Sequence, residues 1–153
     1  MFANLASEDC YSLIKKYEGL RLDAYKCPGG IWTVGYGHTS NVDQHTSITE
    51  IEADIYLGVD VELIEKRLNG DLYVPLTQSM FDAICSFAFN VGTTAFANST
   101  MYKYLSISDY ASAADEFRRW VYAKGKKLPG LQRRRYEERD LFLKDKIDIE
   151  GEG

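Results

Sequence analysis

Hydrophobic residues along the chain are spaced first as in a helix, then as in a short β segment, and then as in a series of helices. In the segment Ser7–Tyr17, Leu13, Ile14 and Tyr17 lie at the i, i+1, i+4 spacing of one helix face. Gly19 follows at a position where it would end the helix. The chain is therefore predicted to begin with an amphipathic helix.

The segment from Tyr25 to His45 has a different composition. Glycines and Pro28 cluster around the β-forming run 31–34. β-branched and aromatic residues bounded by glycine and proline are typical of strands joined by tight turns. We therefore expect a hairpin or a small twisted sheet here.

Helical patterns return at Thr49. Thr49 and Glu52 form a capping box, and the helix that it begins is predicted to run through Ile55, Val59 and Leu63 to Leu68. Thr77 is expected to cap a helix that ends near residues 90–92 and is apolar nearly all round, as a central buried helix would be. Further helices are expected after the caps Ser99 and Ser108, the second with Tyr110, Ala114, Phe117 and Val121 facing inward, and over residues 131–144 after the break at Pro129-Gly130.

The number and order of these elements indicate the fold class. A chain of 153 residues has the length of one domain. A β-rich segment followed by helices indicates an α+β fold, in which a small N-terminal β-hairpin lobe packs beside a mainly helical lobe with a cleft between them. We expect this domain to cover residues 1–144, and residues 145–153 to form a flexible acidic tail.

Composition and charge exclude several classes of protein. The hydrophobic fraction is 45% and the charged fraction 27%, which excludes a disordered chain. The net charge of −5 argues against a nucleic-acid-binding surface over the whole protein. The charge is uneven, however, because residues 1–76 carry six basic and twelve acidic side chains, whereas residues 118–139 carry nine basic and two acidic ones. We therefore expect one basic face and no nucleic-acid partner.

The cysteines and the N-terminus bear on the compartment. Cys10, Cys27 and Cys85 are odd in number and widely spaced, so they match neither a disulfide framework nor a zinc pattern. The first ten residues do not resemble a signal peptide, and no run approaches the roughly 18 apolar residues of a membrane helix. We expect synthesis in a reducing cytoplasm, no stable membrane insertion, no metal and no cofactor.

Glu18 stands where the first predicted helix ends and the glycine-rich segment begins. The negative end of the helix dipole and partial burial both disfavour an ionised carboxylate, and a general acid near neutral pH needs such tuning. A solvated glutamate with a surface partner fits the same position, so the position alone leaves both interpretations open.

Other residues with chemical potential are ambiguous when taken one at a time. Thr33 lies in a predicted strand, where its β-branch is sufficient reason for it. Cys27, nine residues after Glu18, fits either a small core residue or a reactive thiol. His38 fits a hydrogen-bonded structural side chain better than a base.

Together these residues form a specific pattern. The segments 18–25 and 28–39 closely resemble the active-site segment of the phage-type lysozymes, or endolysins (glycoside hydrolase family 24). The segments 76–92, 117–120 and 130–138 resemble the central-helix and C-terminal blocks of that family, so the resemblance covers about residues 7–144 in the same order. It implies hydrolysis of the β-1,4 bond between N-acetylmuramic acid and N-acetylglucosamine in peptidoglycan.

The resemblance also implies roles for individual residues. Glu18 matches the general acid of the family, and Thr33 matches the threonine that helps to position the attacking water. Cys27 stands where the family often has the second carboxylate, an aspartate, although some members carry cysteine there. A thiolate could act as base or nucleophile, a neutral thiol could hold the water, or Asp23 could supply the carboxylate. Our hypothesis is inversion by direct water attack, with Cys27 and Thr33 positioning that water.

Five further residues are candidates for contact with the glycan. Aromatic faces, amides and charged groups suit N-acetyl sugars, although each of these side chains also fits a structural role, and Arg134 and Arg135 could instead pair with Glu18 or with helix-terminal carbonyls. The candidates are Tyr36, His38, Asn90, Trp120 and Arg134.

Competing functions remain open at this stage. A module of the same fold that binds glycan without cutting it would explain Cys27, and a lytic transglycosylase would need only one acid. For an endolysin, the partner is peptidoglycan, the protein is expected to be a monomer, and it would wait in the host cytoplasm for a holin-type pore. The basic stretch 118–139 would attract the anionic wall, and a regulatory Cys10–Cys27 disulfide could form after export.

Overall fold

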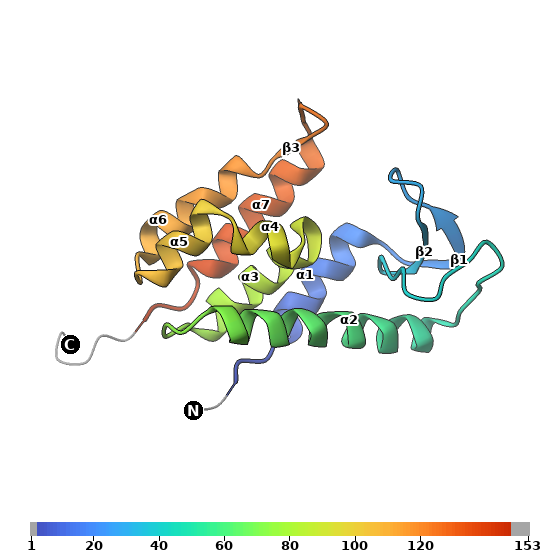
Figure 1. Cartoon of the computed structure of the whole chain (residues 1–153), viewed down its shortest axis with the longest axis horizontal. Coiled ribbons are helices and arrows are strands. Elements are labelled where there is room, and N and C mark those ends of the chain that lie inside the picture. The colour runs from blue at the N-terminus through green and yellow to red at the C-terminus, as the bar shows by residue number, and fades with distance from the viewer. Residues whose placement is uncertain (1–2, 148–153) are drawn as a thin grey trace.

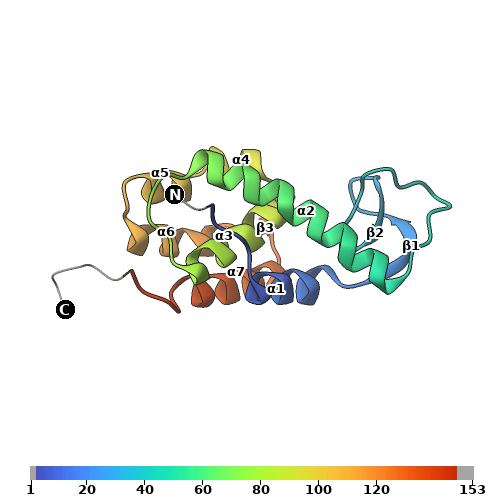
Figure 2. The same cartoon turned by 90° about the horizontal axis from the view of Figure 1, so that it is seen from below.

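Two lobes joined by one long helix make up residues 3–147, which are the residues that the computed structural model describes. The long helix α2 (Glu50–Asp71) runs from the helical lobe to the small N-terminal lobe in both views (Figures 1 and 2). The expected α+β arrangement of a β-hairpin lobe beside a helical lobe is confirmed.

The N-terminal lobe is built on one antiparallel hairpin. Strand β1 (Arg21–Lys26) pairs with β2 (Trp32–Gly35), with Tyr25 opposite Thr33. The loop after β2 returns along β1, where the Ile48 amide donates to the Leu22 carbonyl at 2.9 Å. The predicted hairpin is confirmed, although its first strand begins four residues earlier than the glycine and proline signals indicated.

The helical lobe surrounds α3 (Gln78–Val91), in which every residue from Ser79 to Ala88 is buried, as expected of a central helix. Helix α1 (Glu8–Glu18) packs against α3. The remaining elements follow in chain order: α4 (Thr93–Ala97), α5 (Thr100–Ser106), α6 (Tyr110–Glu116), a 3₁₀ turn (Phe117–Arg119), β3 (Tyr122–Ala123), β4 (Lys126–Lys127) and α7 (Pro129–Phe142).

Most of the predicted helix caps are present. Thr49, Thr77 and Ser99 each accept a hydrogen bond at 3.1 Å from the backbone amide three residues on, and the capping box of α2 is complete. Ser108 was the wrong residue for the next cap. Its φ of 59° places it in the preceding turn, and Asp109 caps α6 instead by accepting from the Ser112 amide.

The C-terminal part differs from the prediction in two places. The helix expected to carry Val121 ends at Glu116, and a two-stranded ribbon, β3–β4, follows the 3₁₀ turn. The last helix begins at Pro129 rather than at residue 131, because a proline is tolerated in the first turn, where its missing N–H has no helical partner.

The predicted tail is partly ordered against the helical lobe. The Asp145 amide donates to Ser79 Oγ at 2.9 Å, and Ile147 packs against the core. The described fold therefore continues past residue 144, and residues 148–153 of the predicted tail lie outside the described residues.

Helix α2 has apolar residues on two faces, and only one is buried. Ala53, Leu57, Val61 and Leu68 form the buried face. The residues through which we expected this helix to run, Ile55, Val59 and Leu63, lie within it but are 50–63% exposed. Both sets have helical spacing, so the sequence pattern alone could not select the buried face.

Candidate active site

Glu18 is the last residue of α1 and lies where the two lobes meet. Gly19, with a φ of 72°, turns the chain out of the helix toward β1. Gly37, in the loop after β2, approaches the carboxyl so closely that a Cβ at this position would lie 3.2 Å from Glu18 Oε1. Only glycine combines this contact with the φ of 88° found there.

Arg134 of α7 holds the carboxyl of Glu18 from the helical lobe. Its Nη1 donates to Glu18 Oε2 at 2.8 Å, and the Glu18 side chain is 23% exposed, whereas that of Arg134 is 3% exposed. Arg134 Nη2 also donates to the Ser86 carbonyl at 3.0 Å. The catalytic candidate is thus bonded to the helical lobe and lies close to Gly37 of the N-terminal lobe, yet it remains accessible to solvent.

Glu138 binds the guanidinium of Arg134 at a different nitrogen from the one that Glu18 binds. Its carboxylate has no solvent exposure and accepts from Arg134 Nε at 3.2 Å, from Arg135 Nη1 at 2.5 Å and from Ser86 Oγ at 2.6 Å. Burial lowers the pKa of Arg135, and the charge of Glu138 opposes this effect. Sequence reasoning missed Glu138, although its i+3 and i+4 spacing from two arginines on one helix was a usable signal.

Cys27 and Thr33 are brought together in the N-terminal lobe. The Cys27 thiol follows β1, and its pKa is lowered chiefly by the backbone N–H groups of Ile31 and Gly29, with a smaller effect from the Thr33 side chain. Thr33 is buried on β2 and donates to the Ile31 carbonyl at 2.9 Å. Backbone donors, rather than a nearby cation, therefore favour the thiolate.

Asp23 has a different environment. It lies on the exposed part of β1, and its Oδ1 accepts from Ser47 Oγ at 2.8 Å. Arg21, two residues before Asp23 on β1, lies over the Tyr25 ring, with its guanidinium carbon 4.3 Å from the ring centroid. Asp23 therefore ties strand β1 to the loop after β2, and this structure gives no support to it as the second carboxylate.

Tyr36 and His38, two candidate glycan contacts, are buried. Tyr36 belongs to the core, with Lys15 Nζ 5.4 Å from its ring centroid. The His38 Nδ1 lies 2.8 Å from Asp60 Oδ2 of α2, and its ring stacks on Tyr56 with centroids 4.5 Å apart. This geometry gives both side chains a packing role and offers no support for direct contact with glycan.

Asn90 and Trp120 are joined by Arg135. Asn90 is exposed, and its Oδ1 accepts from Arg135 Nη2, whereas the Trp120 carbonyl accepts from Arg135 Nε at 2.9 Å. The Trp120 ring packs edge-on against Phe87 at 5.3 Å and lines a hollow of about 410 Å³ beside Tyr122. Of the five candidate contacts, these two keep surface that a sugar could reach.

The two remaining cysteines lie in the core of the helical lobe. Cys10 of α1 and Cys85 of α3 are both buried, and contact with Cys10 together with burial raises the pKa of Cys85. All three cysteines are free. The Cys10–Cys27 disulfide that could form after export is not present in this structure, where α1 directs Cys10 into the core toward α3.

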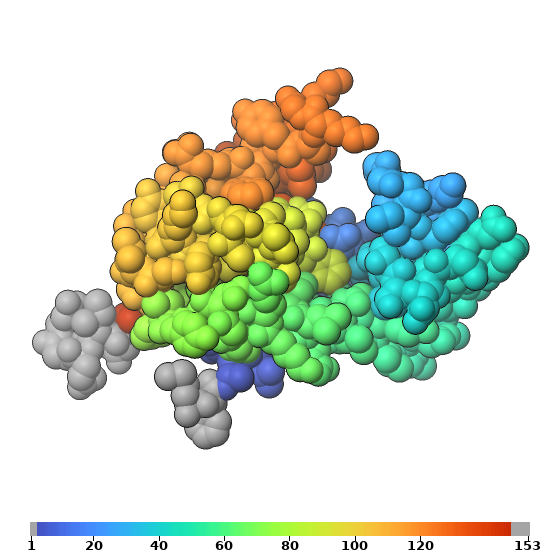
Figure 3. All heavy atoms as spheres, in the orientation of Figure 1, coloured from blue at the N-terminus to red at the C-terminus, as the bar shows by residue number. Residues whose placement is uncertain are grey.

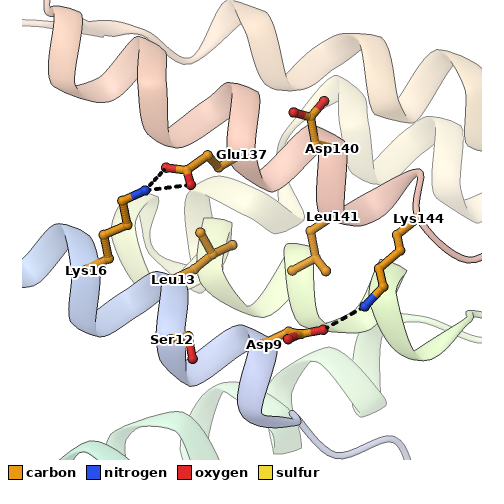
Figure 4. Close-up of a pocket in the computed structure, with 8 residues that line it drawn as sticks. All are labelled: Asp9, Ser12, Leu13, Lys16, Glu137, Asp140, Leu141 and Lys144. Atoms are coloured by element: carbon orange, nitrogen blue, oxygen red, sulfur yellow. Dashed lines mark hydrogen bonds and ion pairs between the residues drawn. The ribbon is translucent and has the colours of Figure 1, made fainter.

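A hollow between the two lobes is visible in the space-filling view (Figure 3), where the ribbon β3–β4 projects toward the N-terminal lobe. Another hollow, of about 420 Å³ and distinct from the one beside Trp120, follows the seam between α1 and α7 (Figure 4). It is closed at its ends by the ion pairs Lys16–Glu137 and Lys144–Asp9. None of the candidate catalytic residues lines it, so we place the site in the hollow between the lobes.

Two classes of site find no support in residues 3–147. Within that range no helix is long and apolar enough to cross a bilayer, and no group of three His, Cys, Asp or Glu side chains is placed to hold a metal ion.

A hairpin lobe and a helical lobe, with a partly exposed glutamate at the end of a helix between them, define a lysozyme-type glycoside hydrolase. The phage lysozyme family model matches residues 15–138, and the chain belongs to that family.

Named relatives and solved structures agree with this assignment. The endolysin of Acyrthosiphon pisum secondary endosymbiont phage 1 is 49% identical over 140 residues, which cover 89% of this chain and 96% of the relative. The endolysin of Salmonella phage P22 is 41% identical over 135 residues, covering 85% and 92% of the two chains. The muramidase domain of SpmX from Asticaccaulis excentricus superposes with a TM-score of 0.86 at 36% identity, covering 92% of this chain and 98% of that one. The protein is thus a lysozyme of the peptidoglycan-lytic endolysin type.

Proposed function

We propose that the chain cleaves the β-1,4 bond between N-acetylmuramic acid and N-acetylglucosamine, with Glu18 as general acid. The observation that supports this most is the placement of Glu18, which is partly exposed at the junction of the lobes and bonded to the buried Arg134. The C-terminal end of α1 disfavours negative charge at this carboxyl. Arg134 stabilises the carboxylate that remains after Glu18 has given its proton to the leaving oxygen.

Cys27 and Thr33 complete the reaction in this proposal. A water molecule attacks the anomeric carbon as the glycosidic C–O bond breaks, and the Cys27 thiolate accepts the proton of that water while Thr33 orients it. Glu18 then ends ionised and Cys27 ends protonated, and exchange with solvent restores both. A lowered thiol pKa increases the thiolate fraction at a given pH, which supports Cys27 in this role. Direct attack by water gives inversion at the anomeric carbon.

Digestion of purified peptidoglycan tests the reaction itself. We expect muropeptides that carry a free reducing N-acetylmuramic acid and, in a proton NMR time course, the inverted anomer as the first product. Products lighter by one water would identify a lytic transglycosylase, and binding without cleavage would identify a glycan-binding module. A first-formed retained anomer would contradict direct water attack.

Replacing Cys27 tests the base. The reaction needs Cys27 ionised and Glu18 protonated, so kcat/KM should be bell-shaped in pH, and the lowered pKa of Cys27 extends activity to lower pH than an ordinary thiol would allow. Cys27→Ser cannot ionise in this range, so we expect a loss of about 10²-fold and the disappearance of the acidic limb. Cys27→Asp, which supplies an ionised carboxylate, should keep both the activity and the acidic limb of the pH profile. A serine variant with near-normal activity would show that the residue only holds water.

We also propose how the protein reaches its substrate. It would accumulate as a monomer in the host cytoplasm and pass a holin-type pore to the cell wall, without binding nucleic acid. The endolysin relatives and the lysozyme family support action on peptidoglycan. Sedimentation of the purified protein tests the monomer, and lysis timing with and without a co-expressed pore tests the route.

A further inference from the structure

The ribbon β3–β4 carries a group of exposed lysines that the proposed reaction does not use. Tyr122 pairs with Lys127 and Ala123 with Lys126, so Lys124 and Gly125 form the two-residue turn. Both turn residues have positive φ, 52° and 77°, as a primed hairpin turn requires. The hairpin register therefore places Lys124, Lys126 and Lys127 together on a short projecting element, and all three are exposed.

These lysines differ from four of the six arginines of the basic stretch 118–139, which are paired with carboxylates. Arg118 and Arg119 pair with Asp115 and Glu116 at 3.1 and 2.9 Å, and Arg134 and Arg135 are buried against Glu138. Within residues 3–147, none of the ribbon lysines has a carboxylate within ion-pair distance. The ribbon therefore holds positive charge that the described protein does not neutralise.

The position of the ribbon indicates which ligand would lie near these lysines. It projects toward the N-terminal lobe across the hollow between the lobes (Figure 3). The ribbon also follows Trp120 closely in the chain, and Tyr122 of β3 and Trp120 together line the separate hollow of about 410 Å³ on the helical lobe. Because the ribbon borders the hollow between the lobes (Figure 3), we expect a polymer that lies there with a bond at Glu18 to come near it.

We propose that Lys124, Lys126 and Lys127 bind the carboxylates of the peptide stems that project from the glycan strand. This inference rests on the proposed function, because it places the glycan in the hollow. The sugars of such a strand are uncharged where the stems are attached through amide bonds, so the anionic groups lie on the peptides. Exposed ion pairs are individually weak, but three cations on one element act together and raise the rate of encounter with an anionic polymer.

The test compares two substrates and two variants with the same charge change. One variant is Lys124→Gln/Lys126→Gln/Lys127→Gln, and the control is Lys66→Gln/Lys103→Gln/Lys146→Gln, which neutralises three exposed lysines away from the ribbon. The substrates are peptidoglycan with its stems and the same glycan after an amidase has removed them. For the ribbon variant we expect KM to rise about tenfold on stem-bearing peptidoglycan only, with kcat unchanged and a weaker salt dependence.

The outcomes separate this inference from the proposed function. A wild-type protein that cleaves neither substrate would contradict the function itself. If wild type cleaves both, an unchanged KM, an equal rise on both substrates, or an equal rise in the control would overturn stem recognition. Binding to anionic phospholipid vesicles that is lost in the ribbon variant, with no stem-dependent change in KM, would assign the lysines to a lipid surface and overturn it as well.

Discussion

Glu18→Gln is expected to lower kcat for peptidoglycan hydrolysis by about 10³-fold and to leave the fold unchanged. The amide cannot supply the proton that the leaving oxygen needs. Its oxygen can still accept from Arg134 Nη1, which holds the native side chain at 2.8 Å, so the junction of the lobes should keep its geometry. Release of reducing ends from purified peptidoglycan measures the loss, and circular dichroism checks the fold.

Glu137→Gln is the matched control for this substitution. Glu137 is a carboxylate on α7 that forms an exposed ion pair with Lys16 at 2.7 Å, and it lines the seam between α1 and α7 rather than the hollow between the lobes (Figure 4). We expect it to keep at least half of the wild-type activity, because exposed pairs contribute about 1 kcal/mol or less. Near-normal lysis by Glu18→Gln would overturn the assignment of the acid.

Local signals in the sequence predicted the framework of the site. The glycine after α1 and the β-formers after Pro28 located Glu18 and Thr33 on the correct elements, and three of the four predicted caps are present. These features depend on residues that are neighbours in the chain, where propensity and capping act.

Contacts between distant residues were not predictable in the same way. Glu18 and Arg134 are 116 positions apart, and their pairing was one of two alternatives that the sequence left open. The structure contains the pair, but nothing in the spacing of either residue had favoured it over a solvated arginine. The nearness of Cys10 to Cys85 was not predictable for the same reason, because only the packing of α1 on α3 brings the two side chains together. The ribbon β3–β4 was missed because a lysine in the turn gives a weaker signal than asparagine would.

Glu138→Gln is expected to destabilise the protein by about 3–5 kcal/mol, the cost of leaving buried charges without their partner. Glu138 is fully buried between Arg134 and Arg135, which are 3% and 1% exposed. Glutamine has nearly the same shape, so the packing of α7 on α3 should change little. The loss of unfolding free energy therefore reports the removal of the negative charge of Glu138. Without it, the guanidiniums of Arg134 and Arg135 would remain in the interior with no carboxylate between them.

Denaturant unfolding of wild type, Glu138→Gln and Glu137→Gln measures this cost, and the exposed Glu137 should contribute less than about 1 kcal/mol. Activity should fall as well, even at temperatures where the variant is folded, because Arg134 Nε loses its acceptor and the guanidinium that holds Glu18 becomes free to move. Equal stabilities for the two variants would show that the buried arginines find other acceptors, and that Arg134 is held by the Ser86 carbonyl and Glu18 alone.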